Sequence, residues 1–139
     1  MSGLKDIGVK VVDAAIAFSA PAILREIEAL LEKLAESGES GVVDLRGVPL
    51  GPADYEMLRN ELGQGEVTAR LDAAGPSEVR ETAYAGVWWV THRDQTENVI
   101  AEFIEVTRMP EILTSQPEDV RAASARLKEK LSSDDALHN

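Results

Sequence analysis

Apolar and charged side chains alternate at helical spacing in the first third of the chain. In residues 21–37 the apolar positions recur every three or four residues, which is typical of a helix with one buried face. They are Ile23, Ile27, Leu30, Leu31 and Leu34. Ser19 is a typical N-cap, Pro21 a typical first-turn residue and Gly38 a typical helix stop. The pattern predicts a helix over Pro21–Ser37 whose apolar stripe packs into the core.

A short strand and a second helix are predicted next. Residues 41–45 have strand character and lead into a loop that contains two prolines and two glycines. Pro52 is suited to open a helix, and Gly63 to end it. One face of this helix would carry Tyr55, Leu58 and Leu62.

The ends of the chain give different signals. Pro117 is suited to open a final helix, and the tail from residue 132 is polar. The stripe of this helix would consist of Val120, Ala123, Leu127 and Leu131. Residues 9–13 fit a strand or a helical turn equally well, so both alternatives stay open.

After Gly65 the period changes to two, which predicts a sheet. Apolar and polar residues alternate over residues 67–71, and further strands are predicted over residues 78–83, 86–92 and 99–106. The connections between these strands are short and polar, which favours an antiparallel meander.

These elements predict an α+β fold. An antiparallel sheet of about four strands packs one face against the Pro21–Ser37 helix, and the other helices flank it. The length of 139 residues suits a single domain over residues 1–139, with an ordered core over about residues 9–131.

The most apolar strand contains both tryptophans of the chain side by side. Neighbouring side chains of a strand point to opposite faces, so Trp88 and Trp89 cannot enter the same core. Trp89 shares a face with Val87, and we assign this pair to the face opposite Trp88. Trp88 then either packs the sheet against a helix or contacts a partner.

Charge and composition exclude several classes of function. The net charge is −11, which disfavours binding to nucleic acids and to anionic membrane surfaces. No apolar run reaches the ~20 residues of a membrane span, and acidic residues interrupt the apolar start, so we expect neither a membrane helix nor a signal peptide. A cytoplasmic location is consistent with these features.

The residues suited to catalysis are few. The chain has no cysteine and two histidines, and no serine lies in a nucleophile-elbow pattern. His92 is either a solvated residue at a strand end or, with Glu81 and Glu102, part of a metal or small-ligand site. We expect no catalytic residue, no bound metal and no cofactor.

The segment that leads into the tryptophans is dense in polar groups. Gly63 and Gly65 fit a helix stop and a turn better than a phosphate loop, and Glu66 follows them. Glu81 and Tyr84 can form hydrogen bonds, and Gly86 permits close approach of another chain. The segment therefore suits a peptide-binding groove around Trp88, or a tryptophan that joins sheet and helix.

The ordered motifs resemble the HupH/HyaF family of hydrogenase expression and formation proteins, in particular its C-terminal domain. Leu-Gly-Gln-Gly-Glu-Val over residues 62–67 is followed by Glu-Thr-Ala-Tyr-Ala-Gly-Val-Trp over residues 81–88. The resemblance covers about residues 23–113. The positions that match the family pattern are Asp44, Pro49, Asp54, Gly63, Gly65, Glu66, Glu81, Thr82, Tyr84, Gly86, Trp88 and Pro110.

The resemblance implies an accessory role without catalysis in the maturation of nickel–iron hydrogenase. The implied partners are the precursor of the iron–sulfur small subunit, before its export, and other hydrogenase maturation proteins. We hypothesise that a partner-binding surface contains Asp44, Gly65, Glu66, Glu81, Thr82, Tyr84, Gly86 and Trp88.

One departure from the family concerns length. Members of the family are expected to be about twice as long, with two related halves, so this chain is either a single-domain relative or a C-terminal half. Two copies would restore a two-domain arrangement, which makes a homodimer one hypothesis. A small-ligand or metal-binding domain around His92, and a purely structural dimerisation module, are the alternatives to an assembly factor.

Overall fold

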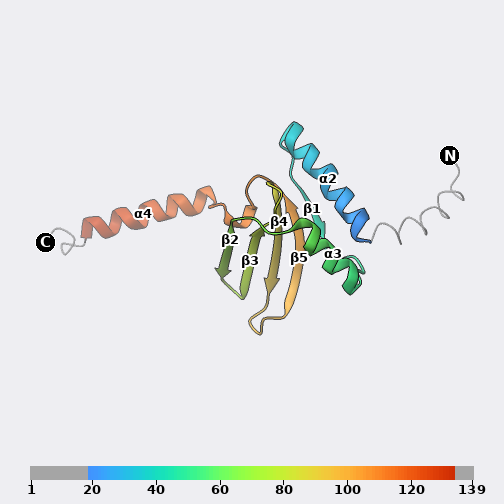
Figure 1. The fold of residues 1–139 in the computed structure, drawn as a ribbon. Coiled ribbons are helices and arrows are strands. Elements are labelled where there is room, and N and C mark those ends of the chain that lie inside the picture. The colour runs from blue at the N-terminus through green and yellow to red at the C-terminus, as the bar shows by residue number, and fades with distance from the viewer. Residues whose placement is uncertain (1–18, 134–139) are drawn as a thin grey trace, which may run out of the picture. The chain divides into compact units, whose positions relative to one another are not determined.

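The computed structural model describes residues 19–133, and the segment 9–13 therefore lies outside the described residues. The chain consists of two compact units, residues 1–108 and residues 109–139. The elements, drawn in Figure 1, are α2 (Ala20–Ser37), β1 (Gly41–Asp44), α3 (Pro52–Leu62), β2 (Thr68–Asp72), β3 (Pro76–Glu81), β4 (Val87–Arg93), β5 (Val99–Val106), η1 (Glu111–Leu113) and α4 (Pro117–Ser133).

One antiparallel sheet forms the centre of the first unit. Its strand order is β1-β5-β4-β3-β2, so the predicted α+β fold with an antiparallel sheet is confirmed. The sheet has five strands, because β1 pairs with β5 along its whole length, with Gly41 opposite Val106 and Asp44 opposite Phe103. Four of these strands form the predicted meander, and β1 extends it at the far edge.

The helix boundaries follow the local signals that were predicted for them. The Ser19 side chain accepts a hydrogen bond from the amide of Ala22 at 3.4 Å, and Gly38 ends α2 with a φ of 77°. Gly63 ends α3 with a φ of 65°. The start of α2 is tied to α3, since the amide of Ala20 donates to a carboxylate oxygen of Asp54 at 3.2 Å.

The hydrophobic core lies between the sheet and the helices α2 and α3 (Figure 1). The helices supply the predicted residues Ile23, Ile27, Leu34, Leu58 and Leu62. The sheet supplies Val43, Val87, Trp89, Ile104 and Val106. Trp89 and Val87 share one face, as the alternation along β4 predicted. That this face is the helix-covered one was not predicted.

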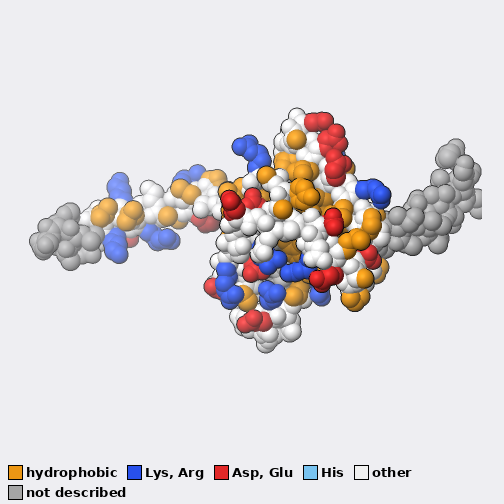
Figure 2. All heavy atoms as spheres, in the orientation of Figure 1, with side chains coloured by type: hydrophobic (Ala, Val, Ile, Leu, Met, Phe, Trp, Pro, Cys, Tyr) orange, Lys and Arg blue, Asp and Glu red, His pale blue; other side chains and the backbone are white. Residues whose placement is uncertain are grey.

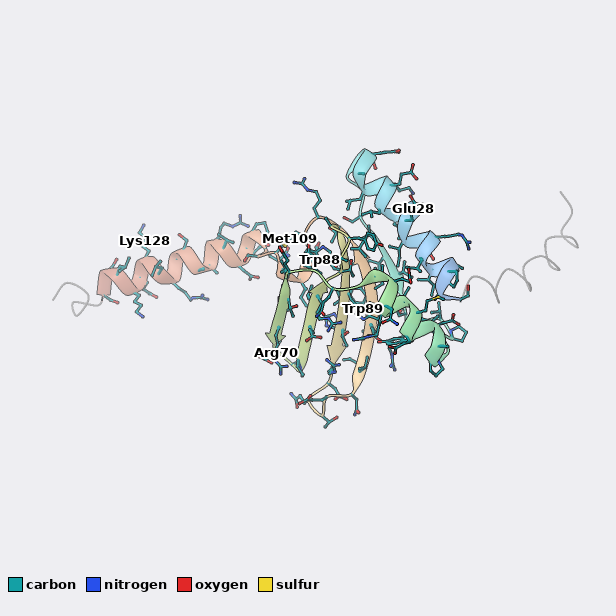
Figure 3. The ribbon with its side chains drawn as sticks, in the orientation of Figure 1. Glu28, Arg70, Trp88, Trp89, Met109 and Lys128 are labelled. Atoms are coloured by element: carbon teal, nitrogen blue, oxygen red, sulfur yellow. The ribbon has the colours of Figure 1, made fainter. Side chains whose placement is uncertain are left out.

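Trp88 lies on the opposite face of β4 and is also buried. Both indole side chains are only 5% exposed, and Figure 3 shows both within the body of the first unit. Trp88 Nε1 donates a hydrogen bond to the backbone oxygen of Thr107 at 3.1 Å. Trp88 therefore leaves little of its own surface exposed, and its polar atom is paired within the fold.

The second unit contains η1 and α4 among its described residues. The helix predicted from Pro117 is present, and none of its side chains is buried. The predicted stripe is exposed, with Val120, Leu127 and Leu131 each about half accessible. None of the described helices is long and apolar enough to cross a membrane.

Candidate functional site

A groove lies beside the C-terminal half of α2, where the turn between β3 and β4 meets it. We call it the α2 groove. It has a volume of about 730 Å³ and a largely apolar lining that includes Leu31, Leu34, Ala35, Ala85 and Trp88. Glu81 and Arg108 supply its charged groups. An apolar surface with a few charged groups is suited to a segment of another protein.

A smaller apolar cavity of about 270 Å³ adjoins this groove and shares Leu31 with it. Its lining comes from α2, from the end of α3 and from the β3–β4 turn, and it includes Leu24, Leu62 and Tyr84. Tyr84 is 52% exposed, so its ring stands at the surface rather than in the core. The two hollows together give α2 an apolar flank that residues 19–108 leave partly open.

Thr82 and Gly86 shape the turn that borders both hollows. The Thr82 hydroxyl donates to the backbone oxygen of Val87 at 2.9 Å and accepts from the amide of Tyr84 at 3.1 Å. Gly86 has a φ of 91°, and a Cβ placed there would lie 3.2 Å from Leu31 Cδ1. Glycine is required because it allows both this backbone conformation and the close approach of α2.

Gly65 and Glu66 are fixed to the same turn by Glu81. The amide of Gly65 donates to the backbone oxygen of Glu81 at 2.8 Å, and the amide of Glu66 donates to its carboxylate at 3.3 Å. A Cβ at Gly65 would lie 2.4 Å from the backbone oxygen of Thr82, so no larger residue fits. The predicted motif consists of residues 62–67 and residues 81–88, and these hydrogen bonds hold its two parts together. We call this region the folded corner.

Most of the predicted site residues are brought together at this corner. They are Gly65, Glu66, Glu81, Thr82, Tyr84, Gly86 and Trp88. Asp44 is separate, because it lies on the edge strand β1 and pairs with Phe103, three positions along β5 from Val106. Its carboxylate accepts from the amide of Arg46 at 3.0 Å, which is a role in the local turn.

The alternative site of His92, Glu81 and Glu102 is not formed. His92 Nδ1 lies 2.7 Å from the Ser77 hydroxyl oxygen, and its side chain is on the face of β4 opposite to Trp89. Glu102 bonds to Trp89 on the helix-covered face, and Glu81 is paired with Trp88 near the other end of β4. Within residues 19–133 no group of three histidine, aspartate or glutamate side chains lies close enough to hold a metal ion.

A buried polar cluster around Glu102 was not predicted. One carboxylate oxygen of Glu102 accepts from the Tyr55 hydroxyl, from Trp89 Nε1 at 2.7 Å and from the Thr91 hydroxyl at 3.4 Å. Burial, the hydrogen bond to Glu102 and its negative charge together raise the pKa of Tyr55 to about 12. The sequence holds a signal for this cluster, since alternation along β5 places Glu102 on the same face as Ile104 and Val106.

Residues 17–133 match the protein family described as HupH hydrogenase expression protein, C-terminal conserved region. The chain belongs to this family. Since the match includes the folded corner and α2, the elements that form the α2 groove are family elements, and the predicted resemblance to HupH and HyaF proteins is confirmed.

Individual relatives agree with this assignment. The chain is 33% identical over 115 residues to the hydrogenase expression/formation protein HupH of Rhodobacter capsulatus, across 81% of this chain and 41% of that protein. It is 32% identical over 113 residues to the hydrogenase expression/formation protein HoxQ of Cupriavidus necator, across 81% of this chain and 40% of that protein. The chain therefore spans about 40% of the length of these curated relatives.

A solved structure has the same fold. The hydrogenase expression protein HupH from Thiobacillus denitrificans superposes with a TM-score of 0.78 at 45% sequence identity. The superposition covers 81% of this chain and 94% of that one.

Proposed function

We propose that this HupH-family chain is a non-enzymatic accessory factor in hydrogenase maturation, and that its α2 groove binds the precursor of the iron–sulfur small subunit. The observation that carries the proposal is that most of the predicted site residues lie at the corner that borders the groove. The relatives are named hydrogenase expression or formation proteins, which supports the process in which the chain acts.

The groove supports binding rather than catalysis. Leu31, Ala35 and Ala85 offer apolar contact area, and burying such area on a partner contributes about 25 cal/mol per Å² before the costs of association. Glu81 and Arg108 supply opposite charges that would fix the orientation of the bound segment. We place this activity in the cytoplasm, before export of the small subunit, where other maturation proteins are further candidate partners.

Co-purification of the tagged chain with separately expressed hydrogenase subunit precursors would test the proposal. Ala35→Arg and Ala85→Arg each place a long charged side chain on the groove at an exposed position. We expect each to weaken capture of the small-subunit precursor at least tenfold, which corresponds to about 1.4 kcal/mol. Ala53→Arg, at an exposed position on α3, is the matched control and should capture as the wild type does.

Two outcomes would contradict the proposal. Failure of the wild-type chain to capture the small-subunit precursor would exclude that partner. Equal capture by all three variants would exclude the α2 groove as the binding surface, provided that circular dichroism shows each variant to be folded.

A further inference from the structure

A third hollow, of about 370 Å³, lies between the end of α3 and strand β3, and its chemistry differs from that of the α2 groove. We call it the arginine pocket. Its lining consists of Arg59, Asn60, Gly63, Gln64 and Arg80. Figure 2 shows several Lys and Arg side chains gathered in this part of the surface, over β3, β4 and α3, although the whole chain carries a net charge of −11.

Arg59 is held in place by aromatic rings. Its guanidinium carbon lies 5.3 Å from the ring centroid of Trp89 and 5.7 Å from that of Tyr55. The two rings meet edge to face at 5.5 Å, and Glu102 accepts hydrogen bonds from both. A contact between a guanidinium and aromatic rings is an attraction to the ring faces, and it does not use up the N–H donors of the guanidinium as hydrogen bonds would.

Arg80 approaches from the sheet. It is the partner of Trp89 in the pairing of β3 with β4, so its side chain leaves the sheet on the face that carries Trp89 and Arg59. The positive charges of Arg59 and Arg80 both act on the Tyr55 hydroxyl, where each lowers the pKa against the larger effects of burial and Glu102. Both cations therefore belong to one local electrostatic environment.

These two cations have no carboxylate partner in the described part of the chain. Within residues 19–133, no ion pair or hydrogen bond joins the guanidinium of Arg59 or Arg80 to another residue. Arg70, on the same sheet face, differs because its Nε lies 3.1 Å from a carboxylate oxygen of Asp72.

We propose that the arginine pocket binds the carboxylate of an acidic residue or C-terminus of a partner protein. Planar guanidinium groups pair with carboxylates through two parallel hydrogen bonds, and the amides of Asn60 and Gln64 can donate to the remaining lone pairs. This site is separate from the α2 groove and does not depend on the proposed function.

The experiment is a titration of the isotope-labelled full chain, followed by NMR through the indole N–H signal of Trp89. The probe is a free tetraglutamate peptide, with tetraglutamine as the uncharged control, at physiological ionic strength. Long-range repulsion by the acidic chain is then screened beyond about 8 Å, so a local site is measured. We expect a saturable shift with tetraglutamate and none with tetraglutamine.

Variants separate the pocket from general charge effects. Arg59→Gln and Arg80→Gln should each weaken tetraglutamate binding at least tenfold, because each variant removes a charged hydrogen-bond donor from the pocket. Arg59→Lys should weaken it as well, since lysine keeps the charge but loses the planar donors. Arg70→Gln removes the same charge outside the pocket and should leave binding unchanged.

Three results would overturn the proposal. The first is the absence of a saturable shift in the wild-type chain. The second is an equal loss of affinity in Arg70→Gln and Arg80→Gln, which would indicate only a diffuse charge effect. The third is binding of inorganic phosphate at least tenfold tighter than tetraglutamate, which would assign the pocket to phosphate groups instead.

Discussion

At the scale of single residues, Glu102 has the largest influence on the polar part of the core. Its side chain is 8% exposed on a strand whose neighbouring inward positions are Ile104 and Val106. A buried carboxylate is tolerated only where donors surround it, and here Tyr55, Trp89 and Thr91 supply them. One acidic residue thereby joins α3 to β4 and supports the stacked Arg59.

Glu102→Ala should lower the free energy of unfolding by about 2–4 kcal/mol, because it leaves the donors of Tyr55 and Trp89 without an acceptor. Glu102→Gln should cost less, since the amide oxygen can still accept from Trp89. Urea denaturation followed by circular dichroism measures both values. Glu56→Ala, at an exposed position on α3, is the control, and a loss no larger than that of this control would refute the role of Glu102.

The raised pKa of Tyr55 predicts a loss of stability at alkaline pH. The phenol ionises near 10.0 when unfolded and at about 12 in the folded chain, so its contribution to stability is complete below pH 10. Between pH 10 and 12 the unfolded state loses this proton first, and stability falls as the pH rises. In denaturation curves over this range, Tyr55→Phe should lose stability less steeply than the wild type, whereas Tyr84→Phe should follow the wild type.

At the scale of elements, the β3–β4 turn contacts several other parts of the fold. Gly86 of this turn contacts α2, and Gly65, which follows α3, donates a hydrogen bond to the backbone oxygen of Glu81 at its start. Tyr84 is exposed between the two apolar hollows. The backbone of Gly86 also accepts from the amide of Thr107 at 2.9 Å, so the turn is fixed to the end of β5. The position of α2, and with it the width of the α2 groove, depends on this turn.

Gly86→Ala should destabilise the fold by about 2–3 kcal/mol, since a Cβ adds both an unfavourable positive φ and a close contact with Leu31 and Leu34. Gly38→Ala is the matched control. It shares the positive φ, but no atom lies within 4 Å of the added Cβ, so it should cost about 1 kcal/mol. Thermal unfolding of both variants gives the comparison, and an equal cost would mean that the contact with α2 is unimportant.

At the scale of the whole molecule, charge is distributed unevenly. The net charge of −11 arises from 25 acidic and 14 basic residues, and Figure 2 shows acidic side chains gathered along α2. The exposed acidic positions of this helix include Glu28, Glu32 and Glu36. An excess of like charge opposes the compact state and keeps copies of the chain apart.

Screening of the excess negative charge by salt should stabilise the folded chain. Raising the sodium chloride concentration from about 0.01 M to about 0.15 M shortens the Debye length from about 30 Å to about 8 Å, so we expect the melting temperature to rise. Differential scanning calorimetry at neutral pH measures the change, with an equal osmolality of sucrose as the uncharged control. A melting temperature that falls with salt would show that attractive ion pairs dominate instead.

Much of the fold could be predicted from local patterns. The helices 20–37, 52–62 and 117–133 follow the expected stripes, and β5 has the predicted bounds 99–106. The second strand was predicted to begin at residue 78, but β3 begins two residues earlier, with Pro76 and Ser77. Proline is compatible with the first position of a strand, where its missing N–H breaks no ladder bond.

The candidate site could be predicted only in part. The folded corner forms because the antiparallel hairpin β2–β3 brings residues 81–88 back beside residues 63–67. The glycines mark this corner in the sequence. Asp44 carries the same family pattern but is distant from the corner. The arginine pocket was missed, since Arg59 and Arg80 are separated along the chain and only the packing of α3 on the sheet joins them.

The sequence by itself determined most of the elements and the faces of the strands, because these follow from the spacing of apolar residues and from glycines and prolines at fixed positions. The family was indicated by the resemblance of the motifs at residues 62–67 and 81–88. Only the tertiary structure decided that β1 joins the sheet beside β5, that Trp88 is enclosed, and that Glu102 gathers Tyr55 and Trp89. Those outcomes depend on contacts between residues far apart in the chain, where burial and hydrogen bonding select one arrangement among many that the local pattern allows.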